Sequence, residues 1–318
     1  MKRSPRALMG VPIDLVCADG VRLGAHLWPA SQSIRGSVII NCATGVQALY
    51  YHRYAAYLAE SGFETLTYDY RGIGASRPDN MRTCGYRWHD WGTLDFEAAI
   101  QFLRRRNPGS ELMIVGHSIG GFIPGLAPSV RHVRRMLTVG AQYAYWRDYQ
   151  ANRRTALVLR WHVFMPIITA LCGYFPGTTL GWLEDLPPGI AYDWAFRRRE
   201  MEAAHPRAIR TTIVEGFKRA TTEILAIVVS DDEFGTLAAI ERALRYYCSA
   251  VHSVVYLTPP DLHTDAIGHF GLFHSRYERS FWTRSLLWLR DGTNPCPQNL
   301  VGTGLTRGAV SRDAPGRR

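Results

Sequence analysis

The sequence predicts an α/β fold, in which helices cover a mostly parallel sheet that is interrupted once by an inserted helical segment. Apolar runs of strand length alternate with helical patterns along most of the chain. Residues 144–215 break this alternation, since they are rich in Trp, Tyr, Phe, Pro and Arg and show no strand pattern. With 318 residues, of which 47% are apolar, the chain can bury one large core and carry an insertion.

These observations divide the chain into four parts. We expect residues 1–143 to form the first part of the core, residues 144–215 a helical cap, and residues 216–291 the second part of the core. Residues 292–318 lack apolar periodicity and are rich in Gly, Pro and Arg, which predicts a disordered basic tail.

The core elements follow one another in the order that an α/β sheet requires. Residues 11–30 predict a hairpin with an Asp-Gly turn. A buried strand is expected within 36–45, followed by a helix over 47–62 that ends on a glycine. Further strands are expected within 63–76, 111–118, 133–143, 223–235 and 252–261, and further helices within 90–109, 236–249 and 279–292.

The net charge of +10 raises the question of nucleic-acid binding, so its distribution matters. Residues 1–10 and residues 301–318 each carry +3, which leaves +4 for the rest of the chain. The internal Arg-Arg-Arg runs at 104–106 and 197–199 are interpreted as solvated helix ends, because cations favour helix C-termini. We therefore expect no nucleic-acid partner.

Targeting and redox signals favour a cytoplasmic protein. The basic N-terminus is not followed by the apolar run of a secretion signal, since Pro12 and Asp14 break it. The most apolar zone contains Arg160, His162 and Pro166, which argues against stable insertion in a membrane. The six cysteines lie too far apart for a metal site or a dense disulfide scaffold.

The stretch "IVGHSIGGF" at 114–122 is the strongest chemical signal. It places Ser118 between Gly116 and Gly120, directly after a predicted strand and before a helix. In a G-x-S-x-G turn the serine occupies a sharp bend that leaves no room for side chains two residues away. This pattern predicts that Ser118 is a nucleophile, and Pro124 predicts that the following helix is short or kinked.

A serine hydroxyl needs a base, which in turn needs an orienting acid. At such a turn the acid and then the histidine follow the serine along the chain. His269 lies on a glycine-flanked loop after the last predicted core strand, and His263 and His274 are its nearest alternatives. Asp231 and Asp232 follow an earlier strand, and either carboxylate fits the order.

The reaction also needs amide donors for a developing oxyanion. One is expected to be the amide of Ile119, directly after the nucleophile. The second should come from the loop after the strand at 36–45, where Ala43 and Thr44 are candidates. Thr44 is preferred because it lies closer to the glycine of that turn.

Four motifs together resemble the α/β-hydrolase superfamily. They are "YDYRGIGAS" (68–76), "GHSIGG" (116–121), "SDDEFG" (230–235) and "IGHFG" (267–271). The stretches "GYFPG" and "EDLPPG" further resemble a bacterial branch of predicted α/β hydrolases, related to serine aminopeptidase-like and lysophospholipase-like proteins. The resemblance covers roughly residues 12–290. One departure is the early loop, which begins His-Gly in much of the superfamily and reads Asn-Cys-Ala-Thr-Gly here.

The resemblance implies an α/β-hydrolase fold and a serine hydrolase. Ser118 would attack an ester, thioester or amide, His269 would move the proton, and no metal or organic cofactor would be required. The superfamily's acid often belongs to an Asp-x-x-x-Pro turn, and Asp232 with Thr236 matches that spacing although Thr replaces Pro. Asp232 is therefore the preferred acid and Asp231 the alternative.

The partner implied is a small acyl substrate, and the oligomeric state is not predicted. Two alternatives remain beside hydrolysis. A serine-dependent acyltransferase would pass the same acyl group to an alcohol or an amine. A catalytically silent binding protein could use the same fold, because fold alone does not imply turnover.

Overall fold

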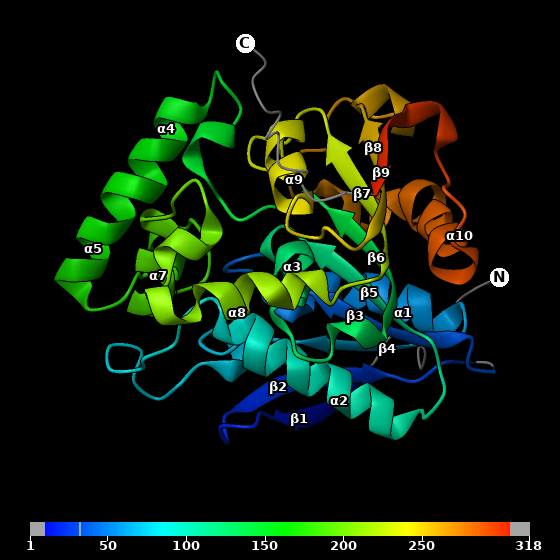
Figure 1. The fold of residues 1–318 in the computed structure, drawn as a ribbon, viewed down its shortest axis with the longest axis horizontal. Helices are drawn as coiled ribbons and strands as arrows, with labels where there is room; N and C mark the ends of the chain where they lie inside the picture. Colours follow the sequence, from blue (N-terminus) through cyan, green and yellow to red (C-terminus); the bar gives the residue numbers. More distant parts are fainter. Residues whose placement is uncertain (1–9, 32, 306–318) are drawn as a thin grey trace, which may run out of the picture.

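The computed structural model describes residues 10–31 and 33–305 and confirms the α/β class (Figure 1). Its strands are β1 (Val11–Val16), β2 (Arg22–Trp28), β3 (Gly36–Asn41), β4 (Phe63–Tyr68), β5 (Leu112–His117), β6 (Val133–Val139), β7 (Glu223–Val229), β8 (Val251–Leu257) and β9 (Leu300–Leu305). They form one nine-stranded sheet in the order β1-β2-β4-β3-β5-β6-β7-β8-β9. Strands β3 to β8 pair in parallel, β2 is antiparallel to β1 and β4, and β9 is antiparallel to β8.

The central strands are buried along their whole length. Every residue of β3, β4 and β5 is buried. Strands β3 and β5 contain the continuous apolar runs expected of strands buried on both faces, whereas β4 also buries the polar side chains of Glu64, Thr65 and Thr67. Helices must therefore cover both faces of the sheet. The nucleophile candidate Ser118 follows β5, in the middle of the sheet.

The core helices are α1 (His52–Glu60), α2 (Glu97–Arg106), α3 (Ile119–Phe122), α9 (Leu237–Leu244) and α10 (Thr283–Asp291). Helices α1 and α10 lie together on one face, where Tyr54 Oη and Ser285 Oγ are 2.7 Å apart, and α3 and α9 lie on the other (Figure 1). Helix α3 is a single turn that passes into a 3₁₀ turn over Ile123–Leu126, as expected from Pro124.

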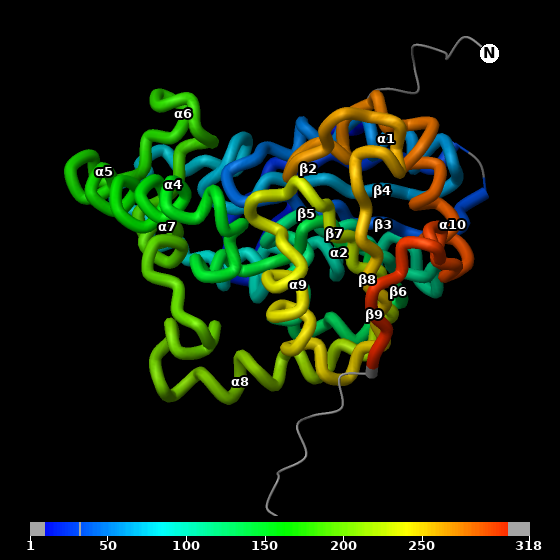
Figure 2. The backbone as a smooth tube through the Cα atoms, turned by 90° about the horizontal axis from the view of Figure 1, so that it is seen from above, coloured from blue at the N-terminus to red at the C-terminus, as the bar shows by residue number. Residues whose placement is uncertain are grey.

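The chain between β6 and β7 folds into α4 (Arg154–Val158), α5 (Met165–Cys172), α6 (Gly177–Leu180), α7 (Pro188–Ala195) and α8 (Arg207–Lys218). Helices α4, α5 and α7 cluster to one side of the sheet in both views, and α8 leads back to β7 (Figures 1 and 2). This cluster faces the end of the sheet at which the loops after β3, β5 and β7 gather.

Helices α4 and α5 form one continuous helix, because a π-helical turn over Leu159–Phe164 joins them. The π turn changes the hydrogen-bond register just before Pro166, so the missing amide of the proline is tolerated. By length and composition, Arg154–Cys172 could cross a membrane, a criterion that some helices of soluble proteins also meet. Only 22% of its most apolar window is buried.

The structure corrects the expectation of a disordered tail from residue 292. A 3₁₀ turn over Pro297–Asn299 leads into β9, which pairs with β8 from Val251 to Val255. The pattern was missed because Gly302 and Gly304 carry no side chains to show strand alternation, and the pairing is made by backbone groups. The rest of the predicted tail, 306–318, lies outside the described residues.

Candidate active site

Ser118 sits in a strained turn at the end of β5. Its backbone angles are φ 55° and ψ −125°, a region that non-glycine residues seldom occupy. A Cβ atom on Gly116 would lie 2.5 Å from Gly121 Cα, and one on Gly120 would lie 2.4 Å from the carbonyl oxygen of Asn41. Both glycines are therefore required by close backbone approach, as the motif predicts.

The Ser118 hydroxyl is held by a residue that the sequence analysis did not single out. Gln142 Nε2 donates to Ser118 Oγ at 3.2 Å, and Gln142 Oε1 accepts a hydrogen bond from the Ala144 amide. Gln142 is buried and follows the end of β6. No motif marks it, because its position depends on the pairing of β6 beside β5.

His269 and Asp232 form a buried pair. The distance from His269 Nδ1 to Asp232 Oδ2 is 2.7 Å, while Asp232 Oδ1 accepts from the amides of Phe234 and Gly235 at 2.8 and 2.7 Å. Burial acts to raise the pKa of Asp232, but His269 and these two amides outweigh it and hold the pKa below its usual value. The carboxylate is therefore ionised at neutral pH and accepts from the imidazole.

Asp231 has a different position, although it is the next residue. Its two carboxylate oxygens accept from the amides of Ile267 and Gly268 at 2.9 and 3.1 Å. Asp231 thus fixes the loop that carries His269 but does not contact the imidazole. The alternative bases His263 and His274 are exposed, and neither lines the cavity that contains Ser118.

His117, the neighbour of Ser118, joins three loops through its two ring nitrogens. His117 Nε2 lies 2.9 Å from the carbonyl oxygen of His269, and Nδ1 lies 2.7 Å from Tyr51 Oη. A carbonyl can only accept, so Nε2 carries the proton and Nδ1 accepts from the tyrosine hydroxyl. Burial lowers the pKa of His117 to about 3, so this neutral tautomer persists at neutral pH.

The same network reaches the candidate oxyanion loop. The Ala43 amide donates to Tyr51 Oη at 3.0 Å and is thereby engaged inside the protein. Ala43, Thr44 and Ile119 all line the cavity next to Ser118. Of the two candidate amides of the early loop, that of Ala43 already has an acceptor.

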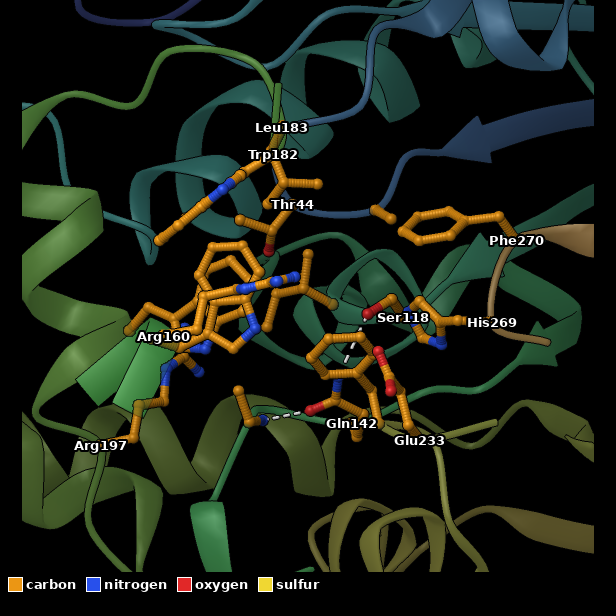
Figure 3. A pocket seen from close by; sticks show the side chains of 16 residues that line it. Thr44, Ser118, Gln142, Arg160, Trp182, Leu183, Arg197, Glu233, His269 and Phe270 are labelled. Carbon is orange, nitrogen blue, oxygen red and sulfur yellow. Dashed lines mark hydrogen bonds between the residues drawn. The ribbon is translucent and has the colours of Figure 1, made fainter. Parts of the chain in front are cut away.

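The site opens into a cavity with about 680 Å³ of empty space, including its mouth (Figure 3). Ser118 and His269 line one part of it, and residues between β6 and β7 line another. Of the aromatic residues of the cap region, Trp161, Trp182 and Trp194 line the cavity, whereas Phe164 is half exposed. Tyr143, just before the cap region, is buried and does not line the cavity.

Three charged residues of this cavity were not predicted as site residues: Arg160, Arg197 and Glu233. The interpretation of residues 197–199 as a solvated run is wrong for Arg197, whose Nε and Nη1 atoms are buried. The chain turns after α7, so that successive arginines point in different directions. Arg198 is exposed, as expected.

Among the described residues, no group of three or more His, Cys, Asp or Glu side chains is arranged to hold a metal ion. The site does contain side chains of the kinds that nucleophilic chemistry uses. A serine on a strained turn and an Asp-oriented imidazole line one cavity, at the carboxyl ends of parallel strands.

The sheet order, the turn at Ser118 and the inserted helices define an α/β hydrolase. Within this class, the model of the serine aminopeptidase S33 family matches residues 32–201, more than half of the chain. The chain belongs to this family. The matched region includes Ser118 but not Asp232 or His269.

Named proteins with a similar sequence or a similar fold are consistent with this class. A monoglyceride lipase of Saccharomyces cerevisiae is 27% identical over 108 residues, and this match spans only 34% of the lipase and 33% of the chain. The structure of a soluble variant of monoglyceride lipase from the same yeast, in complex with a substrate analogue, has a TM-score of 0.63 at 14% identity and covers 92% of this chain and 99% of its own. A Pyrococcus furiosus esterase has a TM-score of 0.60 at 14% identity, over 91% and 94% of the two chains.

The hydroxyl of Tyr51 should contribute more to the free energy of unfolding than the hydroxyl of the neighbouring Tyr50. Tyr51→Phe leaves the Ala43 amide and His117 Nδ1 without a partner in the interior, so we expect a loss of about 1–3 kcal/mol in the free energy of unfolding. Tyr50→Phe is the control, because Tyr50 is partly exposed and its hydroxyl makes one bond, to the Phe270 carbonyl at 2.7 Å. Urea denaturation measures both variants, and equal losses would contradict the network.

Proposed function

We propose that the protein is a serine hydrolase that cleaves carboxylic esters through an acyl-enzyme intermediate. The observation that carries this proposal is that Ser118, on its strained turn, lines the same cavity as His269, whose imidazole contacts the buried carboxylate of Asp232. A structural histidine would not need a buried carboxylate with three donors directed at it. The family and the named relatives support a hydrolase of the esterase or lipase kind.

In the proposed reaction, Ser118 Oγ attacks the ester carbonyl and its proton passes to His269 Nε2. Asp232 holds the imidazole through Nδ1 and stabilises the imidazolium that forms. The proton then leaves with the alcohol, and water activated by the same histidine releases the acid. His117 is not the base, because both of its ring nitrogens are already occupied.

The amides of Ile119 and Thr44 are the proposed donors to the oxyanion. Thr44 is favoured over Ala43 because the Ala43 amide already donates to Tyr51. Gln142 Nε2 fixes the direction of the Ser118 hydroxyl and leaves another lone pair of Oγ for attack.

Replacing the nucleophile tests the whole assignment. Ser118→Ala should fold normally and lower the kcat for 4-nitrophenyl butyrate by about 10³- to 10⁶-fold, as removal of a triad member does. A fluorophosphonate probe should label the wild type and not the variant. Near-normal turnover by Ser118→Ala, or an unlabelled folded wild type, would contradict a serine hydrolase.

Removing one amide tests the oxyanion site. Thr44→Pro should lower kcat by about 10²-fold or more, the usual effect of losing one donor. Thr44→Ala keeps the amide and should retain most of the activity, and circular dichroism checks that the proline variant is folded. If folded Thr44→Pro keeps its rate, the amide of Thr44 is not the donor.

The neighbouring aspartates provide a matched pair of variants. Asp232→Asn should lower kcat by as much as about 10⁴-fold, because an amide favours the wrong tautomer of His269. Asp231→Asn keeps one oxygen for the loop amides and should cost far less. The opposite ranking of the two kcat values would assign the acid to Asp231.

A further inference from the structure

The cap end of the cavity contains two arginines without an ionic partner. Figure 3 shows Arg160 and Arg197 together at the side of the cavity away from Ser118 and His269. Among the ion pairs between described residues, neither arginine takes part. The acid of the cavity, Glu233, pairs instead with Arg153 at 3.0 Å.

Arg197 is the more constrained of the two. Its Nε and Nη1 atoms are buried without a hydrogen-bond partner, while its guanidinium lies 4.4 Å from the centre of the Trp88 ring. The nearby Asp193 does not satisfy it, because that carboxylate is held by Arg87 Nε at 2.8 Å and by Arg87 Nη2. Burial lowers the pKa of Arg197 to about 10, so the group remains charged at neutral pH.

Arg160 adds a second charge beside an aromatic wall. Its guanidinium carbon lies 4.9 Å from the centre of the Trp182 ring and 5.9 Å from that of Trp161. Stacking on aromatic faces leaves the in-plane N–H groups of a guanidinium free to donate. An unpaired buried charge is costly, so the buried Nε and Nη1 atoms of Arg197, with the exposed Arg160 lining the same cavity, indicate that a ligand supplies the missing anion.

We propose that Arg197 and Arg160 bind an anionic group, a carboxylate or a phosphate, at the end of the substrate remote from the scissile bond. The aromatic side chains between the arginines and Ser118 would contact an apolar chain that joins the two ends. This inference rests on the proposed hydrolase activity and names its substrate class. Guanidinium groups match both anions because their paired N–H groups form two parallel hydrogen bonds.

Matched esters test the charge preference. The 4-nitrophenyl monoester of octanedioic acid carries a free carboxylate, and its methyl-capped analogue has the same chain without the charge. Charge-assisted hydrogen bonds contribute about 1.5–3 kcal/mol, so we expect kcat/KM to be about 10- to 100-fold higher for the charged ester. A second pair, 3-carboxyphenyl octanoate and its methyl ester, shows whether the anion belongs to the acyl or the alcohol side.

Three variants test whether Arg197 and Arg160 cause the preference for the charged ester. Arg197→Gln and Arg160→Gln should each reduce the ratio of kcat/KM for the charged ester to kcat/KM for the capped ester at least about 5-fold, the share expected of one guanidinium. Arg198→Gln is the control, because Arg198 is exposed and does not line the cavity. Arg160→Gln keeps the test valid if the Arg197 variant fails to fold.

Binding separates this inference from the proposed function. Calorimetry on Ser118→Ala should show tighter binding of monomethyl octanedioate than of the dimethyl ester, and weaker binding after Arg197→Gln is added. If the anion binds but no ester is cleaved, the hydrolase proposal fails and the anion site stands. If capped and charged esters react equally in both pairs, or both arginine variants keep the preference, the anion site is overturned.

Discussion

The hydrogen-bonded chain from the Ala43 amide through Tyr51 and His117 to the His269 carbonyl holds the loops of the candidate active site in one arrangement. It joins the loop after β3, the turn after β5 and the loop before α10, which are far apart in sequence. Each member is buried, so the loss of one leaves its neighbours unpaired in a medium of low dielectric. In each hydrogen bond only one assignment of donor and acceptor is possible, so the network also fixes the tautomer of His117.

The cavity is built by two parts of the chain with separate tasks. The core strands and their loops supply Ser118, Asp232 and His269, whose positions follow from the sheet. The helices between β6 and β7 supply Trp161, Arg160 and their neighbours. In the proposed function, the first part performs the bond cleavage, and the second decides which molecule reaches the serine. Changes in the cap can therefore alter selectivity while the catalytic geometry is retained.

How well each feature could be predicted depended on how local its cause was. The turn at Ser118 was predictable, since the glycines that it needs lie within two residues, and the spacing of Asp232 to Thr236 pointed to the carboxylate that contacts His269. The inward position of Arg197 was not predictable, because a run of three arginines is usually solvated. Only the turn after α7 directs one of them toward the cavity. Gln142 and β9 could not be predicted, because their positions depend on strand pairing, of β6 with β5 and of β9 with β8. No local sequence pattern indicates these pairings.

The strained backbone of Ser118 has a consequence for laboratory evolution of this protein. A sparsely populated backbone conformation with positive φ costs a serine roughly 1–3 kcal/mol, whereas glycine adopts positive φ readily. Selecting a mutant library for heat resistance alone would therefore favour glycine at this position and enrich clones that lack the hydroxyl. A library meant to yield a more robust enzyme has to be screened for turnover in the same round, or codon 118 has to be left unvaried.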